Sequence, residues 1–264
     1  MDLKKRIIVV TGAASGIGRE LARRFKKEGA KLVVCSDRNG EGAEAVAKEI
    51  GGVAFTTDVG KEEDIRDLIE TVEADVGPID LFCSNAGIGV GGGAEASNEA
   101  WQRIWDINVM AHVWAARALL PGWTARGHGY LVSTASAAGL LTQVSALGYS
   151  ITKHAAVALA EWLSIAYADA GIRVSCLCPQ AVRTPMLDVA LEDPVGAAPL
   201  VAGGVLEPAD VAEAVVAGIR DERFLILPHQ EVAKHLALKG AQPERWLNGM
   251  RRLVRQARAQ TPPA

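Results

Sequence analysis

Short runs of branched apolar residues alternate along the chain with longer stretches in which apolar residues recur every three or four positions. The first run covers residues 6–11, and the stretch after it, residues 16–28, places Ile17, Leu21 and Phe25 on one helical face. The same pattern predicts further strands at residues 31–36, 53–57, 79–84, 129–134, 173–177 and 224–227, and further helices at residues 42–50, 62–75, 98–120, 148–170 and 208–220.

Strict alternation of strand and helix predicts a parallel sheet with helices on both faces. Such strands are buried on both sides and are apolar throughout, as residues 7–10 and 32–34 are. No linker rich in Pro, Gly or Ser divides the chain. The pattern therefore predicts an α/β fold in a single domain over residues 1–264, doubly wound around a parallel sheet of about seven strands.

Two segments depart from the alternation. Residues 183–207 contain three prolines and three glycines, and we expect a long loop that acts as a lid over a substrate. Residues 241–258 form a predicted C-terminal helix with arginines between apolar positions. Packing on its own subunit or on a neighbouring one is the interpretation we favour, with membrane or nucleic-acid binding as the alternative.

The composition excludes several classes of protein. The 264 residues include 28 Lys and Arg against 31 Asp and Glu, a net charge of −3, and 49% of the residues are hydrophobic. A disordered chain has fewer apolar residues, and broad binding to nucleic acid or an anionic membrane needs a basic face. We therefore expect no nucleic-acid partner and no membrane partner.

The compartment is predicted from two apolar segments. Residues 7–10 are too few for the core of a signal peptide. Residues 127–152 contain no Lys, Arg, Asp or Glu and are long enough for a membrane span. Their serines, threonines, glutamine and glycines are instead typical of a partly polar protein interior, so the sequence predicts a soluble cytoplasmic protein.

Four cysteines are too few for a disulfide framework in a chain of this length. Cys176 and Cys178 form a C-x-C pair in an apolar stretch with no second pair to match it. We favour buried, reduced thiols over a metal or redox site, so no metal ligand is expected.

A glycine-rich turn, T-G-A-A-S-G-I-G over residues 11–18, follows the first predicted strand and opens the first helix. At such a junction the free N–H groups and the positive end of the helix dipole favour a pyrophosphate. Gly12 permits the sharp turn, Gly16 lets the backbone approach the ligand, and Gly18 lets the helix pack on the sheet. Followed nineteen residues later by Asp37, the turn predicts a dinucleotide site.

Asp37 ends the second predicted strand, where its carboxylate can accept hydrogen bonds from both ribose hydroxyls of NAD and repel the 2′-phosphate of NADP. A helix N-cap is its alternative role, and the guanidinium of Arg38 could bind that phosphate. We favour NAD and keep NADP as the alternative. Asp58 and Val59 follow the third strand and would lie beside the adenine. The cofactor candidates in this half of the chain are Gly12, Ser15, Gly16, Ile17, Gly18, Asp37, Arg38, Asp58 and Val59.

Tyr149 and Lys153 are four residues apart at the start of a predicted helix, so their side chains share one face. An unperturbed tyrosine has a pKa of about 10 and is a poor base at neutral pH. An ammonium about 4 Å away favours the phenolate by about 4 kcal/mol at an effective dielectric constant near 20, which would lower that pKa by roughly three. Desolvation opposes this effect. A pKa near neutrality, helped by a positively charged nicotinamide, is our hypothesis.

Three further motifs stand in order with these two. N-A-G over residues 85–87 ends the fourth predicted strand, Asn108 lies in the long helix after it, and Ser136 comes thirteen residues before the tyrosine. With these five motifs, and with Asp58-Val59 after the third strand, the chain resembles the short-chain dehydrogenase/reductase family over about residues 5–227. The resemblance implies a Rossmann domain that binds NAD(P) and interconverts a secondary alcohol and a ketone by hydride transfer.

The resemblance also implies a role for each matching residue. Tyr149 would be the acid/base, and Ser136 would hydrogen-bond the carbonyl or alcohol oxygen. Lys153 would hold the nicotinamide ribose and lower the pKa of the tyrosine, and Asn108 would bind a water that links the lysine to solvent. The catalytic candidates are therefore Asn108, Ser136, Tyr149 and Lys153.

Two more segments line the cofactor in this family. The N-A-G motif would steady the central sheet and lie along the cofactor. Residues 178–185 resemble the segment around the nicotinamide amide, where the Val182 backbone and Thr184 would contact the carboxamide. Gln180 stands where the family usually has glycine, and its side chain could reach into the substrate pocket. The cofactor candidates in this half are Asn85, Ala86, Gly87, Tyr149, Lys153, Pro179, Val182 and Thr184.

The expected pocket walls are mostly apolar, which fits a medium-sized apolar ketone or secondary alcohol as the small-molecule substrate. No pair of basic residues is placed to clamp a carboxylate or phosphate, although Arg183 is a single candidate. With NAD, oxidation of the alcohol is the expected direction. The substrate candidates are Ser136, Ala138, Gln143, Tyr149, Gln180 and Met186.

Two other functions stay open. An NADPH-dependent carbonyl reductase would use the same residues, and a non-catalytic NAD-binding or sensing protein could share the fold. In this family the two long helices, residues 98–120 and 148–170, usually pair across subunits. The alanine-rich face of the second helix, with Trp162, fits a homotetramer or homodimer.

Overall fold

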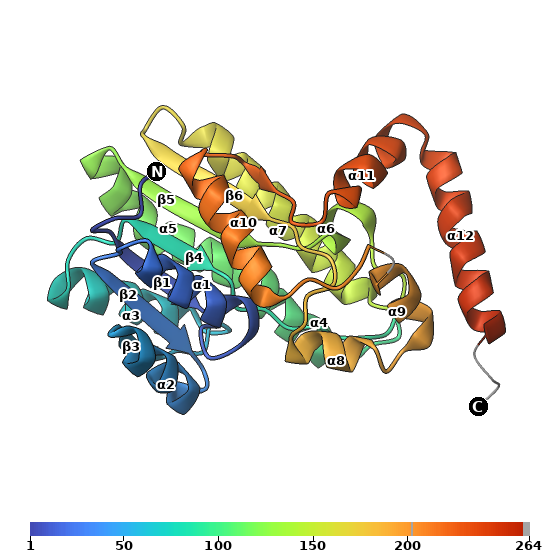
Figure 1. The fold of residues 1–264 in the computed structure, drawn as a ribbon, viewed down its shortest axis with the longest axis horizontal. Coiled ribbons are helices and arrows are strands. Elements are labelled where there is room, and N and C mark those ends of the chain that lie inside the picture. The colour runs from blue at the N-terminus through green and yellow to red at the C-terminus, as the bar shows by residue number, and fades with distance from the viewer. Residues whose placement is uncertain (202, 261–264) are drawn as a thin grey trace.

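The computed structural model describes residues 1–201 and 203–260. In this part of the chain seven strands form one parallel sheet in the order β3-β2-β1-β4-β5-β6-β7 (Figure 1), which confirms the predicted doubly wound α/β fold. The order reverses between β1 and β4, and ligands of such sheets bind at this switch point. The strands are β1 (Ile7–Thr11), β2 (Leu32–Asp37), β3 (Val53–Thr56), β4 (Leu81–Ser84), β5 (Gly129–Thr134), β6 (Ile172–Leu177) and β7 (Leu225–Ile226).

Helices bury both faces of the sheet because alternate residues of each strand point to opposite sides. In β1, Val9 packs into one core and Ile8 and Val10 into the other. The first core is covered by α3 (Glu62–Asp75), α5 (Ala111–Arg126) and α7 (Leu147–Ala166), and the second by α1 (Gly16–Lys27), α2 (Gly40–Ile50) and α10 (Pro208–Arg220). The other helices are α4 (Asn98–Trp105), the π-helical turn η1 (Asp106–Met110), α6 (Ala138–Leu141), α8 (Pro185–Ala190), α9 (Pro194–Val201), α11 (Glu231–Ala241) and α12 (Pro243–Gln260).

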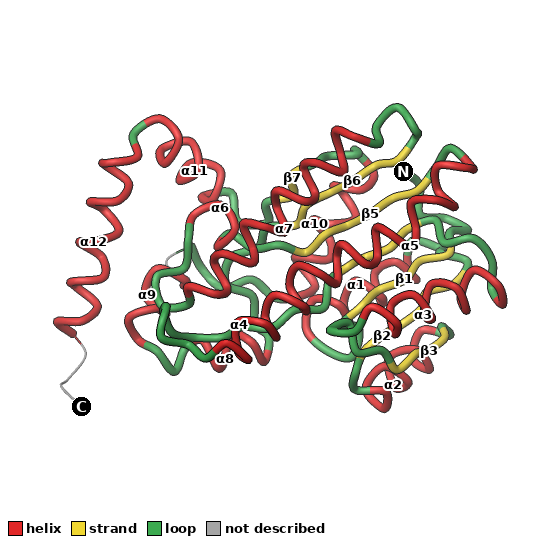
Figure 2. The backbone as a smooth tube through the Cα atoms, turned by 180° about the vertical axis from the view of Figure 1, so that it is seen from behind, coloured by secondary structure: helices red, strands yellow, loops and turns green. Residues whose placement is uncertain are grey.

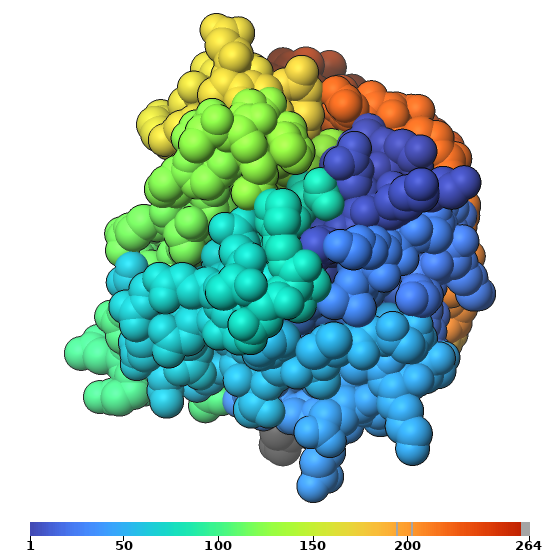
Figure 3. Space-filling model, turned by 90° about the vertical axis from the view of Figure 1, so that its left-hand side faces the viewer, coloured from blue at the N-terminus to red at the C-terminus, as the bar shows by residue number. Residues whose placement is uncertain are grey.

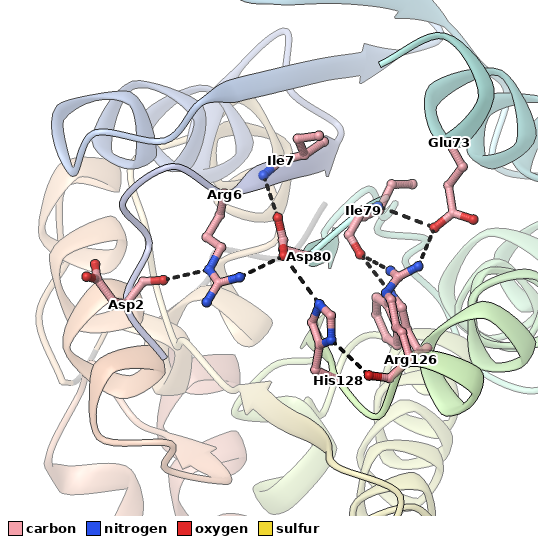
Figure 4. A network of polar contacts seen from close by, with 9 residues as sticks. Asp2, Arg6, Ile7, Glu73, Ile79, Asp80, Arg126 and His128 are labelled. Carbon is pink, nitrogen blue, oxygen red and sulfur yellow. Dashed lines mark hydrogen bonds and ion pairs between the residues drawn. The ribbon is translucent and has the colours of Figure 1, made fainter. Parts of the chain in front are cut away.

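The amino ends of the central strands are joined by a polar network around Asp80 (Figure 4). The Asp80 carboxylate accepts a hydrogen bond from the Ile7 backbone N–H at 2.9 Å and one from Arg6 Nη1 at 3.0 Å, and His128 Nε2 lies 3.7 Å away. Seen from the left of Figure 1, the face of the molecule is built largely from the N-terminal half of the chain, blue to cyan (Figure 3). The candidate functional residues follow the opposite, carboxyl ends of the strands.

The segment of residues 183–207 is not the continuous loop that the sequence predicts, because it contains α8 and α9. Each of these helices begins with a proline, Pro185 and Pro194. Proline lacks an N–H group that the first helical turn does not use, and its fixed φ suits a helix start. A proline-rich segment can therefore still form short helices. Residue 202 lies outside the described residues.

Three other helices differ from the prediction. The helix predicted at residues 98–120 is interrupted by η1 and continues to Arg126, and the one predicted at residues 148–170 ends at Ala166. The C-terminal helix predicted at residues 241–258 is α12, and α11 before it was not predicted. Both extend away from the sheet (Figure 2), and α12 packs against α9 and α11.

Among the described residues, no helix combines the length and apolar character that crossing a membrane requires. The four cysteines are free and buried, which agrees with the predicted reduced thiols. Burial raises the pKa of Cys35 to about 11, since the thiolate loses hydration there. Residues 1–201 and 203–260 contain no cluster of His, Cys, Asp or Glu that could hold a metal ion.

Candidate active site

The glycine turn between β1 and α1 has a shape that glycine alone permits. Gly12 and Gly16 have positive φ angles of 68° and 54°, which L side chains rarely adopt. A Cβ at Gly18 would lie 2.1 Å from the Gly12 carbonyl oxygen, so the start of α1 packs directly on the turn. Within the described residues the Ser15 side chain makes no capping hydrogen bond. The N–H groups at this helix start are thus available to an anion, and the cradle fits a dinucleotide pyrophosphate.

Asp37 ends β2 beside this turn. Its carboxylate accepts hydrogen bonds from the Ala14 backbone N–H at 3.0 Å and the Asn39 backbone N–H at 2.9 Å. The N-cap of α2 is Asn39, whose side chain accepts from the Gly42 N–H, so the alternative role of Asp37 as that cap is wrong. Asp37 therefore places a fixed negative charge at the end of β2, next to the exposed Arg38.

The residues after β3 and β4 lie along the same edge. Asp58 accepts a hydrogen bond from the Gly60 N–H at 3.0 Å, and Val59 is buried. Asn85 donates to the Thr11 carbonyl at 2.9 Å through its side chain, and the Ala86 N–H donates to Thr11 Oγ1 at 3.1 Å. The N-A-G segment thus ties β4 to the strand that leads into the glycine turn.

Asn108 lies in η1 and is fully buried. Its side chain exchanges two hydrogen bonds with the Ile88 backbone, both at 2.9 Å. A Cβ at Gly87 would lie 3.3 Å from Asn108 Oδ1 and 3.4 Å from Lys153 Nζ, so these three residues converge on one point. Single π-helical turns are frequent at functional sites, and this one faces the end of β4.

Ser136 follows β5, and Tyr149 and Lys153 lie in the first two turns of α7. The Ser136 hydroxyl donates to the Pro179 carbonyl at 3.4 Å and accepts from the Ala138 N–H at 3.1 Å. Lys153 Nζ donates to the Thr134 carbonyl at 2.8 Å and lies 5.7 Å from the centre of the Tyr149 ring. The structure therefore brings the four catalytic candidates together at the carboxyl ends of β4 and β5.

Burial controls the titration of this cluster. It raises the pKa of Tyr149, because the phenolate loses hydration, while the nearby Ser136 hydroxyl acts in the opposite direction. Burial also lowers the pKa of Lys153 from 10.5 to about 8. In the chain without cofactor, the pKa of Tyr149 is therefore shifted upward, opposite to the expected direction, and burial is the largest cause. The hypothesis of a pKa near neutrality included a positively charged nicotinamide and stays a prediction.

The segment after β6 closes over the glycine turn. The Pro179 carbonyl accepts a hydrogen bond from the Ala137 N–H at 2.8 Å, which fixes this segment to the end of β5. Thr184 donates through Oγ1 to the Val182 carbonyl at 3.2 Å. A Cβ at Gly16 would lie 3.0 Å from Thr184 Cγ2. Thr184 thus lies against the glycine turn, and Val182 is bonded to Thr184.

The two glutamines among the substrate candidates hold α9. Gln143 donates through Nε2 to the Gly196 carbonyl at 3.0 Å, and Gln180 donates through Nε2 to the Pro199 carbonyl at 2.9 Å. The Gln180 side chain is therefore hydrogen-bonded to α9, and its predicted reach into the substrate pocket stays a prediction. Met186 on α8 is exposed and lies over Gly89.

The sequence reading missed His229, which lies after β7 and is buried. Its Nδ1 accepts a hydrogen bond from the Gln180 backbone N–H at 3.2 Å. Burial lowers the pKa of His229, which keeps the ring neutral and able to accept this bond. The other site residues follow the ends of strands, and His229 stands two positions after the last predicted strand. This position could have identified His229 as a candidate from the sequence. Arg183 pairs instead with Glu207 at 2.6 Å on the surface.

Comparison with known proteins gives the class. The sequence profile of the family described as short chain dehydrogenase matches residues 6–194. The chain is 32% identical over 257 residues to estradiol 17-beta-dehydrogenase 11 of Homo sapiens, with 94% of this chain and 83% of that protein covered. The chain therefore belongs to the short-chain dehydrogenase/reductase family, and is an oxidoreductase that acts on alcohol and carbonyl groups with NAD(P).

Two further comparisons extend this relationship. The chain is 37% identical over 225 residues to 2,5-dichloro-2,5-cyclohexadiene-1,4-diol dehydrogenase of Sphingobium indicum, with 81% of this chain and 90% of that protein covered. A short-chain dehydrogenase/reductase from Burkholderia phymatum in complex with NAD has a similar structure, with a TM-score of 0.85 and 27% identity, covering 92% of this chain and 96% of that one. The family domain thus accounts for most of the chain.

Proposed function

We propose that this protein is an NAD-preferring dehydrogenase that interconverts a cyclic, apolar secondary alcohol and the corresponding ketone, with Tyr149 as the acid/base. The observation that carries the proposal is the convergence of Ser136, Tyr149 and Lys153 beside the glycine cradle. A protein that only bound NAD would need the cradle but not this cluster.

The residues have distinct tasks in this mechanism. NAD, when bound in the glycine cradle beside Asp37, would supply the hydride-accepting chemistry for oxidation of the alcohol. Tyr149 takes the hydroxyl proton of the alcohol through its phenolic oxygen and returns it in the reverse reaction. Ser136 holds the same substrate oxygen. Lys153 holds the cofactor ribose, and Asn108 binds a water through which the proton passes from Lys153 to solvent. Because burial raises the pKa of Tyr149, alcohol oxidation should speed up as pH rises above 7.

The substitution Tyr149→Phe tests the mechanism. It removes the proton-transfer group and should reduce turnover by at least about 100-fold, with NAD affinity retained. Tyr167→Phe, at the far end of α7, is the matched control and should leave turnover unchanged. Near-wild-type turnover in Tyr149→Phe would remove Tyr149 from the mechanism.

The preference for NAD rests on Asp37. Its carboxylate ends β2, already fixed by the Ala14 N–H, and would repel a 2′-phosphate. Arg38 favours the alternative, an NADPH-dependent carbonyl reductase, because its exposed guanidinium is adjacent. Titrations with NAD and NADP should show that NAD binds more tightly. The substitution Asp37→Asn should reduce the difference between the two affinities. Tighter binding of NADP by the wild type would establish the alternative.

The proposed substrate class rests on the apolar character of the substrate candidates and on the relatives. The substrate candidates in α6 and α8 include the apolar residues Ala138 and Met186, and the Arg183 guanidinium is paired with Glu207 on the surface. The names of two relatives refer to ring alcohols, estradiol in one and a cyclohexadiene diol in the other. Absorbance of the reduced cofactor, followed over cyclohexanol, cyclohexane-1,4-diol and 17β-estradiol, should show turnover. Tight NAD binding without turnover over such a panel would favour the non-catalytic alternative.

Self-association is part of the proposal. Along one face of α7 the apolar side chains of Leu147, Ile151, Trp162 and Ile165 are exposed, with Ile165 76% exposed. Large apolar side chains exposed along one face of a surface helix are typical of a protein interface. Light scattering should give the mass of a homodimer or homotetramer, and Ile165→Glu should reduce it. A monomeric wild type would contradict this part of the proposal.

A further inference from the structure

The short helix α6 lies between α7 and α11, two helices that are far apart from each other in the sequence. On one side a Cβ at Gly139 would lie 2.4 Å from the Lys153 carbonyl oxygen, so the α6 backbone rests directly on α7. On the other side α11 contacts α6, and Lys239 Nζ donates a hydrogen bond to the Leu140 carbonyl at 2.6 Å. Helix α6 thus lies between the main chain of Lys153 and the side chain of Lys239.

The end of α6 needs such support. The last carbonyls of a helix have no partner within it, and a four-residue helix leaves nearly all of its carbonyls in this state. Thr142, which ends α6, has a φ of 77°, a strained value for a β-branched residue. The next residue, Gln143, is held by the Ser150 hydroxyl at 2.8 Å. Burial lowers the pKa of Lys239, so this lysine is not an ordinary solvated surface group.

The other end of α6 orients the serine of the site. The Ala138 N–H donates to Ser136 Oγ at 3.1 Å, which leaves the hydroxyl proton to point toward the Pro179 carbonyl or a bound oxygen. A movement of α6 would therefore turn the Ser136 hydroxyl. Lys239 lies in α11 and bonds to the Leu140 carbonyl of α6, so its influence on Ser136 would pass through α6.

We propose that Lys239 is a positioning residue, which seats α6 against α7 and thereby orients the Ser136 hydroxyl for the reacting oxygen. This inference rests on the proposed function for its effect on turnover. It concerns a residue of the C-terminal segment, beyond the matched residues 6–194. A merely stabilising lysine would change the melting temperature without changing the local order of α6 or the rate of the chemical step.

Hydrogen exchange of the amides of residues 139–143 tests the seating without any substrate. Lys239→Met removes the donor but keeps most of the side chain, and should speed exchange there by about tenfold, the effect of one charged hydrogen bond. Lys239→Arg should restore slow exchange. Lys234→Met, on an exposed position of the same helix, is the matched control. An unchanged exchange rate in Lys239→Met would overturn the proposal. If Lys239→Met fails to fold, Lys239→Gln is used in its place.

Kinetics with the most active alcohol of the cyclohexanol, cyclohexane-1,4-diol and 17β-estradiol panel tests the effect on Ser136. Lys239→Met should lower kcat by about tenfold with NAD affinity unchanged, and Lys239→Arg should recover most of it. A fall in NAD affinity with unchanged kcat would overturn the assigned role. If Tyr149→Phe kept full activity, the proposed function would fail, while the exchange comparison would still decide whether Lys239 seats α6.

Discussion

Replacing Lys153 by Met should make the folded chain respond differently to pH. The lysine side chain is only 3% exposed, and burial lowers its pKa from 10.5 to about 8. The unfolded chain therefore holds this proton more tightly than the folded chain between pH 8 and 10.5. Burying the charged lysine lowers the free energy of unfolding. This penalty is complete below pH 8 and disappears as the pH rises past 10.5.

The size of the effect follows from the two pKa values. At about 1.4 kcal/mol per pH unit, the penalty is about 3 kcal/mol at pH 7 and about 1 kcal/mol at pH 10. Lys153→Met has no such group, so its stability lacks this penalty at either pH. It also lacks the hydrogen bond to the Thr134 carbonyl, a loss that is nearly independent of pH because a neutral amine also donates. Between pH 7 and pH 10, the free energy of unfolding of the wild type should therefore rise by about 2 kcal/mol relative to that of the variant.

Urea unfolding followed by tryptophan fluorescence measures this difference, at one protein concentration and at pH 7 and pH 10. Titration of all other groups cancels when the two proteins are subtracted, and Lys31→Met, at an exposed position, is the control that should show no change. A difference between wild type and Lys153→Met that stays constant with pH, or moves in favour of the variant as pH rises, would refute the reasoning. The variant should also lose turnover, so the buried charge serves function at the expense of stability.

Two further substitutions probe the two ends of the sheet. Gly18→Ala places a Cβ 2.1 Å from the Gly12 carbonyl oxygen. The substitution should destabilise the fold by about 1–3 kcal/mol and weaken NAD binding in a cofactor titration. An unchanged melting temperature and an unchanged NAD affinity would contradict the close packing at Gly18. Asp80→Asn removes the charge that accepts from Ile7 and Arg6 at the amino ends, and should cost about 1–2 kcal/mol in urea unfolding. Since this network lies away from the cofactor cradle, NAD affinity should be unaffected, and a large fall in affinity would show coupling between the two ends.

Much of this architecture was predictable from local sequence. Strand and helix periods, and the apolar content of the strands, predicted the parallel sheet because these signals depend on residues a few positions apart. The glycine turn was predictable for the same reason, since a strand, a turn and a helix start are consecutive in the chain. Its positive φ at Gly12 and Gly16 is a local backbone requirement that glycine meets.

The candidate site was predictable in part. Residues that follow parallel strands must meet at one edge of the sheet, and Tyr149 and Lys153 share a face because they are one helical turn apart. The direction of the tyrosine pKa was not predictable, because desolvation depends on everything packed around the phenol. The secondary structure of residues 183–207 was also mispredicted, since prolines and glycines indicate a loop while α8 and α9 form within this segment.

The sequence by itself determined the sheet, the cofactor turn and the order of the motifs, because each depends on neighbouring residues and on strand alternation. The tertiary structure alone decided which side chains hold the site in place. Gln180 reaches α9, His229 accepts from the Gln180 backbone, and Lys239 supports the Leu140 carbonyl across 99 residues of chain. No periodicity reports such contacts, since they arise only when distant segments pack and their polar groups must find partners away from water.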